Sequence, residues 1–106
     1  MAGDRAFMEH VMGLLEPVAG VTSRAMFGGY GIFQDGDMFA LISDSRLYFK
    51  VSDSNRDRFL EAGSEQFKPM PYYEVPTEVM EERRLFLEWA DVSIVVGHVT
   101  AKKRKK

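Results

Sequence analysis

The chain has 106 residues, of which 45% are hydrophobic, and it carries 14 basic and 16 acidic side chains. That length and apolar content suit one compact globular domain. Cysteine is absent, so disulfides and thiolate chemistry are excluded. The first residues, MAGDRAFMEH, lack the basic and then apolar layout of a signal peptide, and no apolar run is long enough for a transmembrane helix. We therefore expect a cytoplasmic protein that does not enter a membrane.

The positive charge is concentrated at the end of the chain. Residues 102–106 read KKRKK and supply five of the 14 basic side chains, so residues 1–101 hold nine basic and 16 acidic side chains, and 9 − 16 = −7. We expect residues 1–101 to form a single domain and residues 102–106 to form a basic tail. Such a tail can contact nucleic acid or an acidic partner, or it can be a solvated helix end. Its members are Lys102, Lys103, Arg104, Lys105 and Lys106.

The first expected element is a helix. Residues 4–15 place apolar side chains such as Phe7, Val11 and Leu15 at three- and four-residue spacing, and Pro17 ends that pattern. Residues 21–27 follow; they include β-branched side chains and precede a cluster of glycines, so we expect them to be extended.

The clearest pattern is a meander of strands in the middle of the chain. Asp35-Gly36 separates two apolar runs, and this dipeptide favours the type I′ turn of a β-hairpin because both central residues need positive φ. Asp44-Ser45 repeats the arrangement before the run RLYFKV. We predict three antiparallel strands here and a fourth strand before them.

The last third of the chain alternates between helix and strand. Residues 52–62 fit a helix that Gly63 closes. Three prolines within PMPYYEVP prevent a helix there, so this stretch is expected to be extended at a sheet edge. From Thr77 the spacing predicts a final helix with apolar side chains on more than one side. Such a helix packs in a groove or meets a second copy of itself.

The predicted order is therefore one helix, three or four strands, a helix, one or two strands and a helix. Antiparallel strands followed by helices define an α+β fold in which the helices pack on the sheet.

The stretch MFGGYGIF raises the question of a phosphate site. Gly29 and Gly31 match two positions of the dinucleotide motif G-x-G-x-x-G, but Gln34 occupies the third position and a strand follows instead of a helix. The pattern fits better with a bend between strands or with close approach of other backbone. We assign five residues to a candidate surface for a partner or ligand: Phe27, Gly28, Gly29, Tyr30 and Gly31.

No catalytic or metal site is expected. His10 and His98 lie on different predicted helices, without further ligands at metal-binding spacing. The serines fall in turns and caps, outside any G-x-S-x-G elbow. Nothing marks a carboxylate as desolvated, as acid–base catalysis requires. We predict no catalytic residue, no metal and no cofactor.

The stretch PMPYYEVP supplies a second candidate surface. A strand here directs Tyr72 and Tyr73 to opposite faces, so that one is buried and the other exposed. An exposed tyrosine beside Glu74 is a candidate recognition surface; the alternative is an edge strand held by its prolines. A small-ligand pocket near Tyr30, Tyr72 and Tyr73 also remains open.

Taken in order, MFGGYGIF, DGDMFALI, RLYFKV, NRDRF, PMPYYEVP and LEWA resemble the TfoX/Sxy N-terminal domain family, over about residues 22–91. The resemblance implies an α+β domain of the type III secretion chaperone-like kind. It also implies a regulator of natural competence that acts at promoters with a cyclic-AMP receptor protein, and it supplies no catalytic residues. Full-length competence regulators carry a second, C-terminal domain, where this chain has KKRKK.

We therefore expect a non-enzymatic regulator or adaptor that binds proteins, such as transcription machinery or a cyclic-AMP receptor protein, and that forms a homodimer through its last helix. One alternative is weak nucleic-acid binding through the basic tail, which the negative charge of residues 1–101 opposes. The other alternative is a small-ligand-binding domain.

Overall fold

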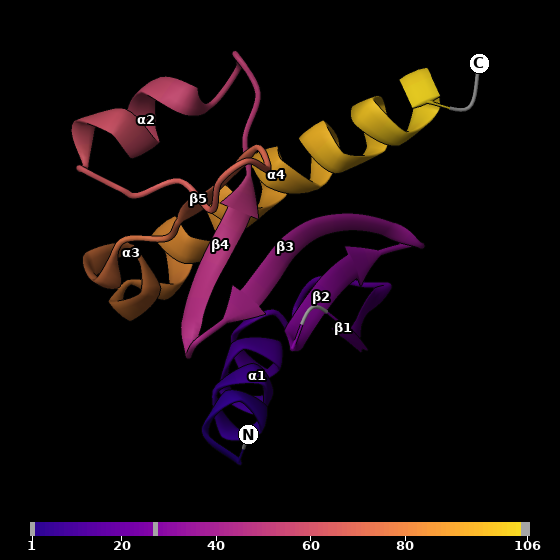
Figure 1. Ribbon diagram of the computed structural model, residues 1–106, viewed down its shortest axis with the longest axis vertical. Coiled ribbons are helices and arrows are strands. Elements are labelled where there is room, and N and C mark those ends of the chain that lie inside the picture. The colour runs from indigo at the N-terminus through magenta and orange to yellow at the C-terminus, as the bar shows by residue number, and fades with distance from the viewer. Residues whose placement is uncertain (1, 27, 105–106) are drawn as a thin grey trace.

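A five-stranded antiparallel sheet forms the middle of the molecule (Figure 1). The structure, a computed structural model, describes the backbone of residues 2–26 and 28–104 and the side chains of residues 4–26 and 28–103. In chain order the elements are α1 (Ala2–Leu14), β1 (Val21–Met26), β2 (Gly29–Gln34), β3 (Asp37–Ser43), β4 (Arg46–Lys50), α2 (Arg56–Glu61), β5 (Tyr72–Glu74), α3 (Thr77–Glu81) and α4 (Arg83–Arg104).

The strands lie in the sheet in the order in which they occur in the chain, β1-β2-β3-β4-β5. Two tight turns make this possible. In the turn between β2 and β3, Asp35 and Gly36 have φ of 51° and 91°, and between β3 and β4 Asp44 and Ser45 have φ of 54° and 58°. These are the positive values that a type I′ turn needs at both central residues. The predicted antiparallel sheet and α+β class are confirmed.

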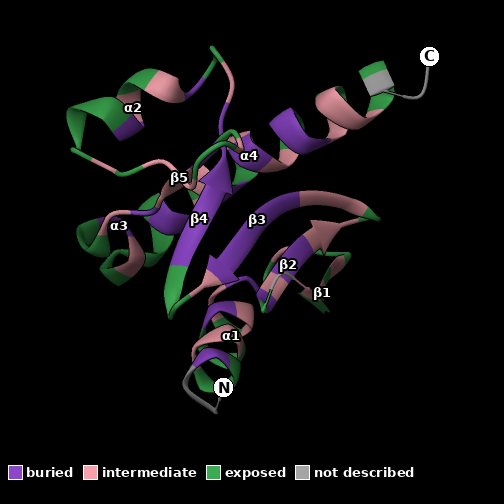
Figure 2. Cartoon of the chain, in the orientation of Figure 1, coloured by how far each residue is buried: buried purple, intermediate pink, exposed green. Residues whose placement is uncertain are grey.

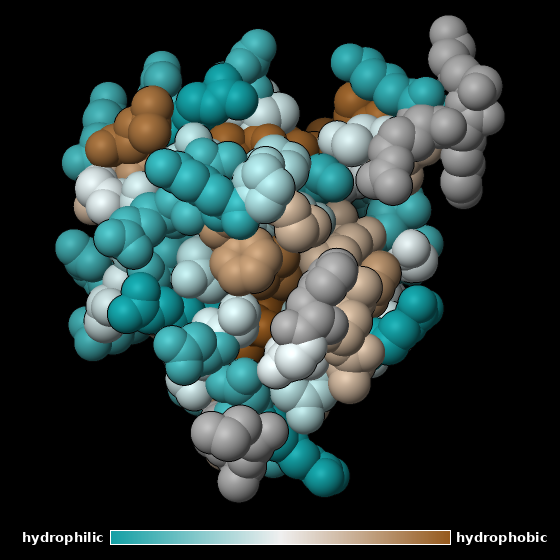
Figure 3. All heavy atoms as spheres, viewed as in Figure 1, coloured by the Kyte–Doolittle hydropathy of each residue, from teal (hydrophilic) through white to brown (hydrophobic). Residues whose placement is uncertain are grey.

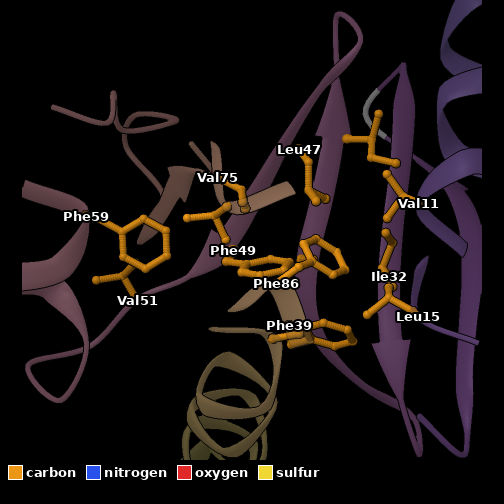
Figure 4. Close-up of a cluster of buried hydrophobic side chains, with 14 residues drawn as sticks. Val11, Leu15, Ile32, Phe39, Leu47, Phe49, Val51, Phe59, Val75 and Phe86 are labelled. Atoms are coloured by element: carbon orange, nitrogen blue, oxygen red, sulfur yellow. The ribbon is translucent and has the colours of Figure 1, made fainter. Parts of the chain in front are cut away.

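One face of the sheet is covered by helices. The cross-strand pairs Ala40–Phe49 and Ile42–Leu47 share this face, and they belong to one core cluster with residues of α1, α3 and α4. In the close-up of Figure 4, Phe49 and Phe86 lie next to each other at the junction of the sheet with α4, and their ring centroids are 5.6 Å apart. Figure 2 shows that β3 and β4 are the most continuously buried elements.

The region after Thr77 forms two helices, whereas the sequence predicts one. Glu82 has φ −111° and ψ 99° and ends α3 in an extended conformation. The backbone N–H of Phe86 then donates to the carbonyl of Glu82 at 2.8 Å, and α4 begins in a new direction. No helix among the described residues is both long and apolar enough to cross a lipid bilayer.

The proline-rich stretch forms the edge of the sheet, as predicted. Within the sheet its strand β5 pairs with β4, and on its other side Tyr73 forms an isolated antiparallel bridge with Gln66. The chain before β5 is fastened to the sheet by backbone hydrogen bonds, among them Val51 N–H to the carbonyl of Pro71 and Phe67 N–H to the carbonyl of Tyr72, both 2.8 Å. Residues 65–67 therefore lie along the outer side of β5.

Candidate functional site

The glycine cluster makes a turn and a tightly packed strand. Gly28 has φ +73°, which favours glycine, and β2 begins at Gly29. A Cβ atom on Gly29 would lie 2.0 Å from the backbone oxygen of Ile42, and one on Gly31 would lie 2.5 Å from the sulfur of Met26. These glycines therefore allow β3 backbone and a methionine side chain to approach β2 closely. Phe27, which also belongs to this candidate surface, lies outside the described residues.

The three candidate tyrosines lie on two different faces of the sheet. Tyr30 pairs with Ile42, Tyr73 pairs with Phe49, and both tyrosines pack against the helix-covered core. Tyr72 is buried on the opposite face of the sheet.

The charged residue beside these tyrosines, Glu74, forms a partly exposed ion pair. Its carboxylate lies 3.9 Å from the guanidinium of Arg46, which also approaches Glu65 at 3.8 Å. Glu74 is paired with Tyr48 across the two strands. Burial of the Tyr48 hydroxyl, and then the negative charge of Glu74, raise the pKa of Tyr48 above its ordinary value of 10.0.

The face of the sheet opposite α1 and α4, which we call the open face, carries a second apolar cluster. Leu41, Tyr48 and Tyr72 are its buried members. Residues 64–71 cover one end of it, where the rings of Tyr48 and Phe67 have centroids 5.2 Å apart. The remainder is uncovered by any described helix. Figure 1 views the sheet from this side, and Figure 3 shows hydrophobic residues gathered in the middle of the same view with polar residues around them.

A hollow of about 610 Å³ lies on the open face beside this cluster. We call it the open-face hollow. Three methionines line it together with aromatic side chains and the C-terminal end of α4. The residues that matter for its chemistry are Met26, Phe33, Asp37, Met38, Lys50, Met70 and Tyr72. Methionine side chains are flexible and polarizable, so a surface built from them adapts to different apolar partners.

Gly97 explains how α4 reaches this hollow from the other face. A Cβ atom at Gly97 would lie 2.7 Å from the backbone oxygen of Met38. Without a side chain, α4 can cross the start of β3 in direct backbone contact. The next turn of the helix then places Thr100 and Ala101 at the edge of the hollow.

Two cations lie over aromatic rings on the open face. The Lys50 side chain has its ammonium 5.4 Å from the centroid of Tyr72, and the guanidinium of Arg24 lies 5.0 Å from the centroid of Phe33. Lys50 is only 7% exposed, whereas Arg24 is exposed. Cation–π contacts of this kind hold a positive charge next to apolar surface, so this part of the open face combines apolar and positive character.

A histidine links the end of α4 to the β2–β3 hairpin. Nδ1 of His98 lies 2.7 Å from the carboxylate of Asp37, and Nε2 lies 2.6 Å from Oε1 of Gln34. The amide nitrogen of Gln34 donates to the carbonyl of Ala19 at 2.8 Å. This bond leaves the amide oxygen of Gln34 facing His98, so each imidazole nitrogen lies within hydrogen-bonding distance of an oxygen atom. In the sequence His98 stands out only as a histidine without metal-binding partners, and no spacing connects it to residues 34 and 37.

No cluster of three or more His, Asp or Glu side chains able to hold a metal occurs among the described residues. The predicted basic tail continues α4, because the helix runs to Arg104. Lys102 and Lys103 are exposed on its last turn. Lys105, Lys106 and the side chain of Arg104 lie outside the described part of the chain.

These features define a small α+β domain with helices on one sheet face and a methionine-lined hollow on the other. The chain belongs to the TfoX N-terminal domain family, whose profile matches residues 13–96. The predicted family resemblance is thereby confirmed. The chain is also similar to the DNA transformation protein TfoX1 of Aliivibrio fischeri, with 32% identity over 83 residues. The matched region covers 71% of this chain and 39% of that relative, so the chain spans well under half of the relative's length.

Proposed function

We propose that this chain is a non-enzymatic regulatory domain that works in the cytoplasm by binding another protein, in the control of DNA transformation. Membership of the TfoX N-terminal domain family and the name of the A. fischeri relative support the process. The observation that carries the mode of action is the open-face hollow, where half-buried methionine side chains and Phe33 reach the surface of a sheet whose other face is covered by helices.

The partner segment that fits this hollow is apolar with acidic flanks. Apolar side chains of the partner would be removed from water against Met26, Met38 and Met70. Each large apolar side chain contributes on the order of 1.5–3 kcal/mol to binding before the entropy lost on association is subtracted. Carboxylates beside those side chains would lie near the positive charge of Arg24. Charge of this kind increases the association rate and excludes basic competitors.

Transcription machinery and a cyclic-AMP receptor protein are the first partners to test. Titration calorimetry with the purified receptor protein, with and without cyclic AMP, and then with RNA polymerase, measures binding directly. Met26→Glu and Met70→Glu each place a charge in the hollow and should weaken binding by about tenfold or more. Leu60→Glu is the matched control, because Leu60 is an exposed apolar residue of α2 outside the hollow.

Each result decides a separate part of the proposal. Binding that is unchanged by both methionine substitutions would remove the hollow from the mechanism. No binding by either candidate at high micromolar concentration would exclude those partners. Stabilisation of the wild-type chain by a nucleotide or metabolite, lost in Met26→Glu, would instead make the hollow a small-ligand site.

A further inference from the structure

The outer side of α4 carries a regular row of residues that lies outside both the core cluster and the open-face hollow. The row advances alternately by three and four positions, which is the spacing of a coiled-coil seam. Its members, which we call the α4 seam, are Leu85, Glu88, Val92, Val95, Val99 and Lys102. The core-facing side of the same helix is different and includes Phe86, Ala90, Ser93 and Gly97.

The middle of the α4 seam is apolar and open to solvent. Val95 is 58% exposed and Val99 is 48% exposed, and Leu85 is 37% exposed. Among the described residues only Leu60 joins them as an exposed large hydrophobic side chain. Scattered exposed apolar residues need no explanation, but half-buried Val92 and exposed Val95 and Val99 follow one another on one row of the helix and form a short continuous stripe. Exposed stripes of this kind mark contact surfaces.

Two members of the seam carry opposite charges at equal distances from Val95. Glu88 lies seven residues before Val95 and Lys102 lies seven residues after it. Each is therefore two helical turns from Val95, about 10.5 Å along the axis. Glu88 is 62% exposed, and its ion pair with Arg58 is long, at 3.9 Å. Lys102 is exposed as well.

This arrangement complements itself when a second α4 is turned around. If a two-fold axis passes at Val95, the two helices run antiparallel and the valines meet at the centre. Glu88 of each copy then faces Lys102 of the other, and a two-fold interface forms both pairs at once. A parallel arrangement would instead bring Glu88 to Glu88 and Lys102 to Lys102. Small valine side chains allow the two helices to approach closely.

We propose that two copies of this chain associate through antiparallel packing of the α4 seam, with Val95 at the two-fold axis and Glu88 paired with Lys102 of the partner copy. The apolar centre of the seam is short, so the dimer is weak and reversible and depends on the charges of Glu88 and Lys102. The seam and the open-face hollow use different sides of α4, so this association neither requires nor blocks the proposed partner binding.

Sedimentation equilibrium over a range of concentrations measures the dimer. Val95→Lys places two like charges at the axis and should raise the dissociation constant by about tenfold or more. Glu88→Lys replaces two attractive pairs with repulsive ones and should weaken the dimer by a similar factor, about tenfold. The double variant Glu88→Lys/Lys102→Glu restores attraction and should return the dissociation constant close to that of the wild type. Leu60→Lys is the control for a charge placed on an unrelated exposed apolar residue.

Thermal unfolding of every variant checks that the fold is retained. A strict monomer at high micromolar concentration overturns the proposal, and so does a dimer that Val95→Lys leaves intact. A dimer that Glu88→Lys weakens but the double variant does not restore overturns the antiparallel arrangement. Because these measurements use no partner protein, their failure is distinguishable from failure of the proposed function at the open-face hollow.

Discussion

Substitution of Gly29 by alanine tests whether the glycine cluster serves packing. A Cβ atom at Gly29 would lie 2.0 Å from the backbone oxygen of Ile42, and real Cβ atoms essentially never come closer than 3.0 Å to such an atom. The two strands would therefore have to separate locally by at least 1.0 Å, from 2.0 to 3.0 Å. The obstacle is backbone inside a paired sheet, so no side-chain rotation relieves the clash.

Two other glycines provide matched controls. Gly28 has φ +73°, and apart from its chain neighbours no described atom lies within 4 Å of the position that its Cβ would occupy; Gly13, in the last turn of α1, has equally open surroundings. Gly28→Ala should cost about 1 kcal/mol, because only the left-handed conformation opposes alanine. Gly13→Ala should stabilise the helix by roughly 0.5–1 kcal/mol. Gly29→Ala should cost about 3 kcal/mol, at the upper end for overpacking.

Urea unfolding followed by the fluorescence of Trp89 measures these differences, since Trp89 packs edge-on against Phe59 with centroids 4.8 Å apart. In a domain of this size a loss of about 3 kcal/mol lowers Tm by roughly 12–24 °C. A Gly29→Ala variant as stable as Gly28→Ala would refute the packing argument. If a nucleotide stabilised the wild-type chain but not a fully folded Gly29→Ala variant, the glycine cluster would be a phosphate-binding site after all.

Three further predictions concern charged and titrating groups. His98→Ala should lower the free energy of unfolding by about 1–2 kcal/mol, which is the contribution of a hydrogen bond to a carboxylate reduced because the pair is partly exposed. A double-mutant cycle with Asp37→Ala should show coupling between the two residues. Burial raises the pKa of Tyr48 above 10.0, so the folded state holds the phenolic proton more tightly than the unfolded state does. The resulting contribution to the free energy of unfolding is fully present below pH 10.0 and is lost as the pH rises through the pKa of the folded state. Urea unfolding at several pH values should show this loss in the wild type and not in Tyr48→Phe. Any binding of duplex DNA at low salt should fall steeply with salt concentration and disappear when Lys102 and Lys103 are replaced by glutamine, as fluorescence anisotropy can measure. Binding that persists in this variant would show that these two lysines are not the DNA contact.

The hairpins were predictable because their chemistry is local. A type I′ turn needs two consecutive residues at positive φ, and Asp35-Gly36 indicates one between two apolar runs. Once successive strands are joined by such turns, an antiparallel meander follows, and with it the α+β class. The extended conformation of the proline-rich stretch was predictable for a similarly local reason, since its three prolines prevent a helix.

The candidate site was less predictable because it depends on which face each side chain occupies. The register between β2 and β3 shifts between Ile32 and Phe33, where Ile32 pairs with Ala40 but Phe33 pairs with Met38. The intervening Phe39 packs in the helix-covered core, whereas Leu41 belongs to the open-face cluster. Simple alternation would have placed both on one face. No residue in the apolar run MFALI marks the irregularity, so the methionine-lined hollow is not visible in the sequence.

The apolar character of α4 on several sides has a structural explanation in three separate surfaces. One side packs on the sheet around Phe86, the flank at Thr100 and Ala101 borders the open-face hollow, and the third carries Val95 and the α4 seam. Association through the seam would give each dimer two hollows related by its two-fold axis. A partner with two suitable segments would then bind with avidity as well as affinity. On this reasoning Val95→Lys should weaken binding of such a two-site partner while leaving the affinity for an isolated single segment unchanged.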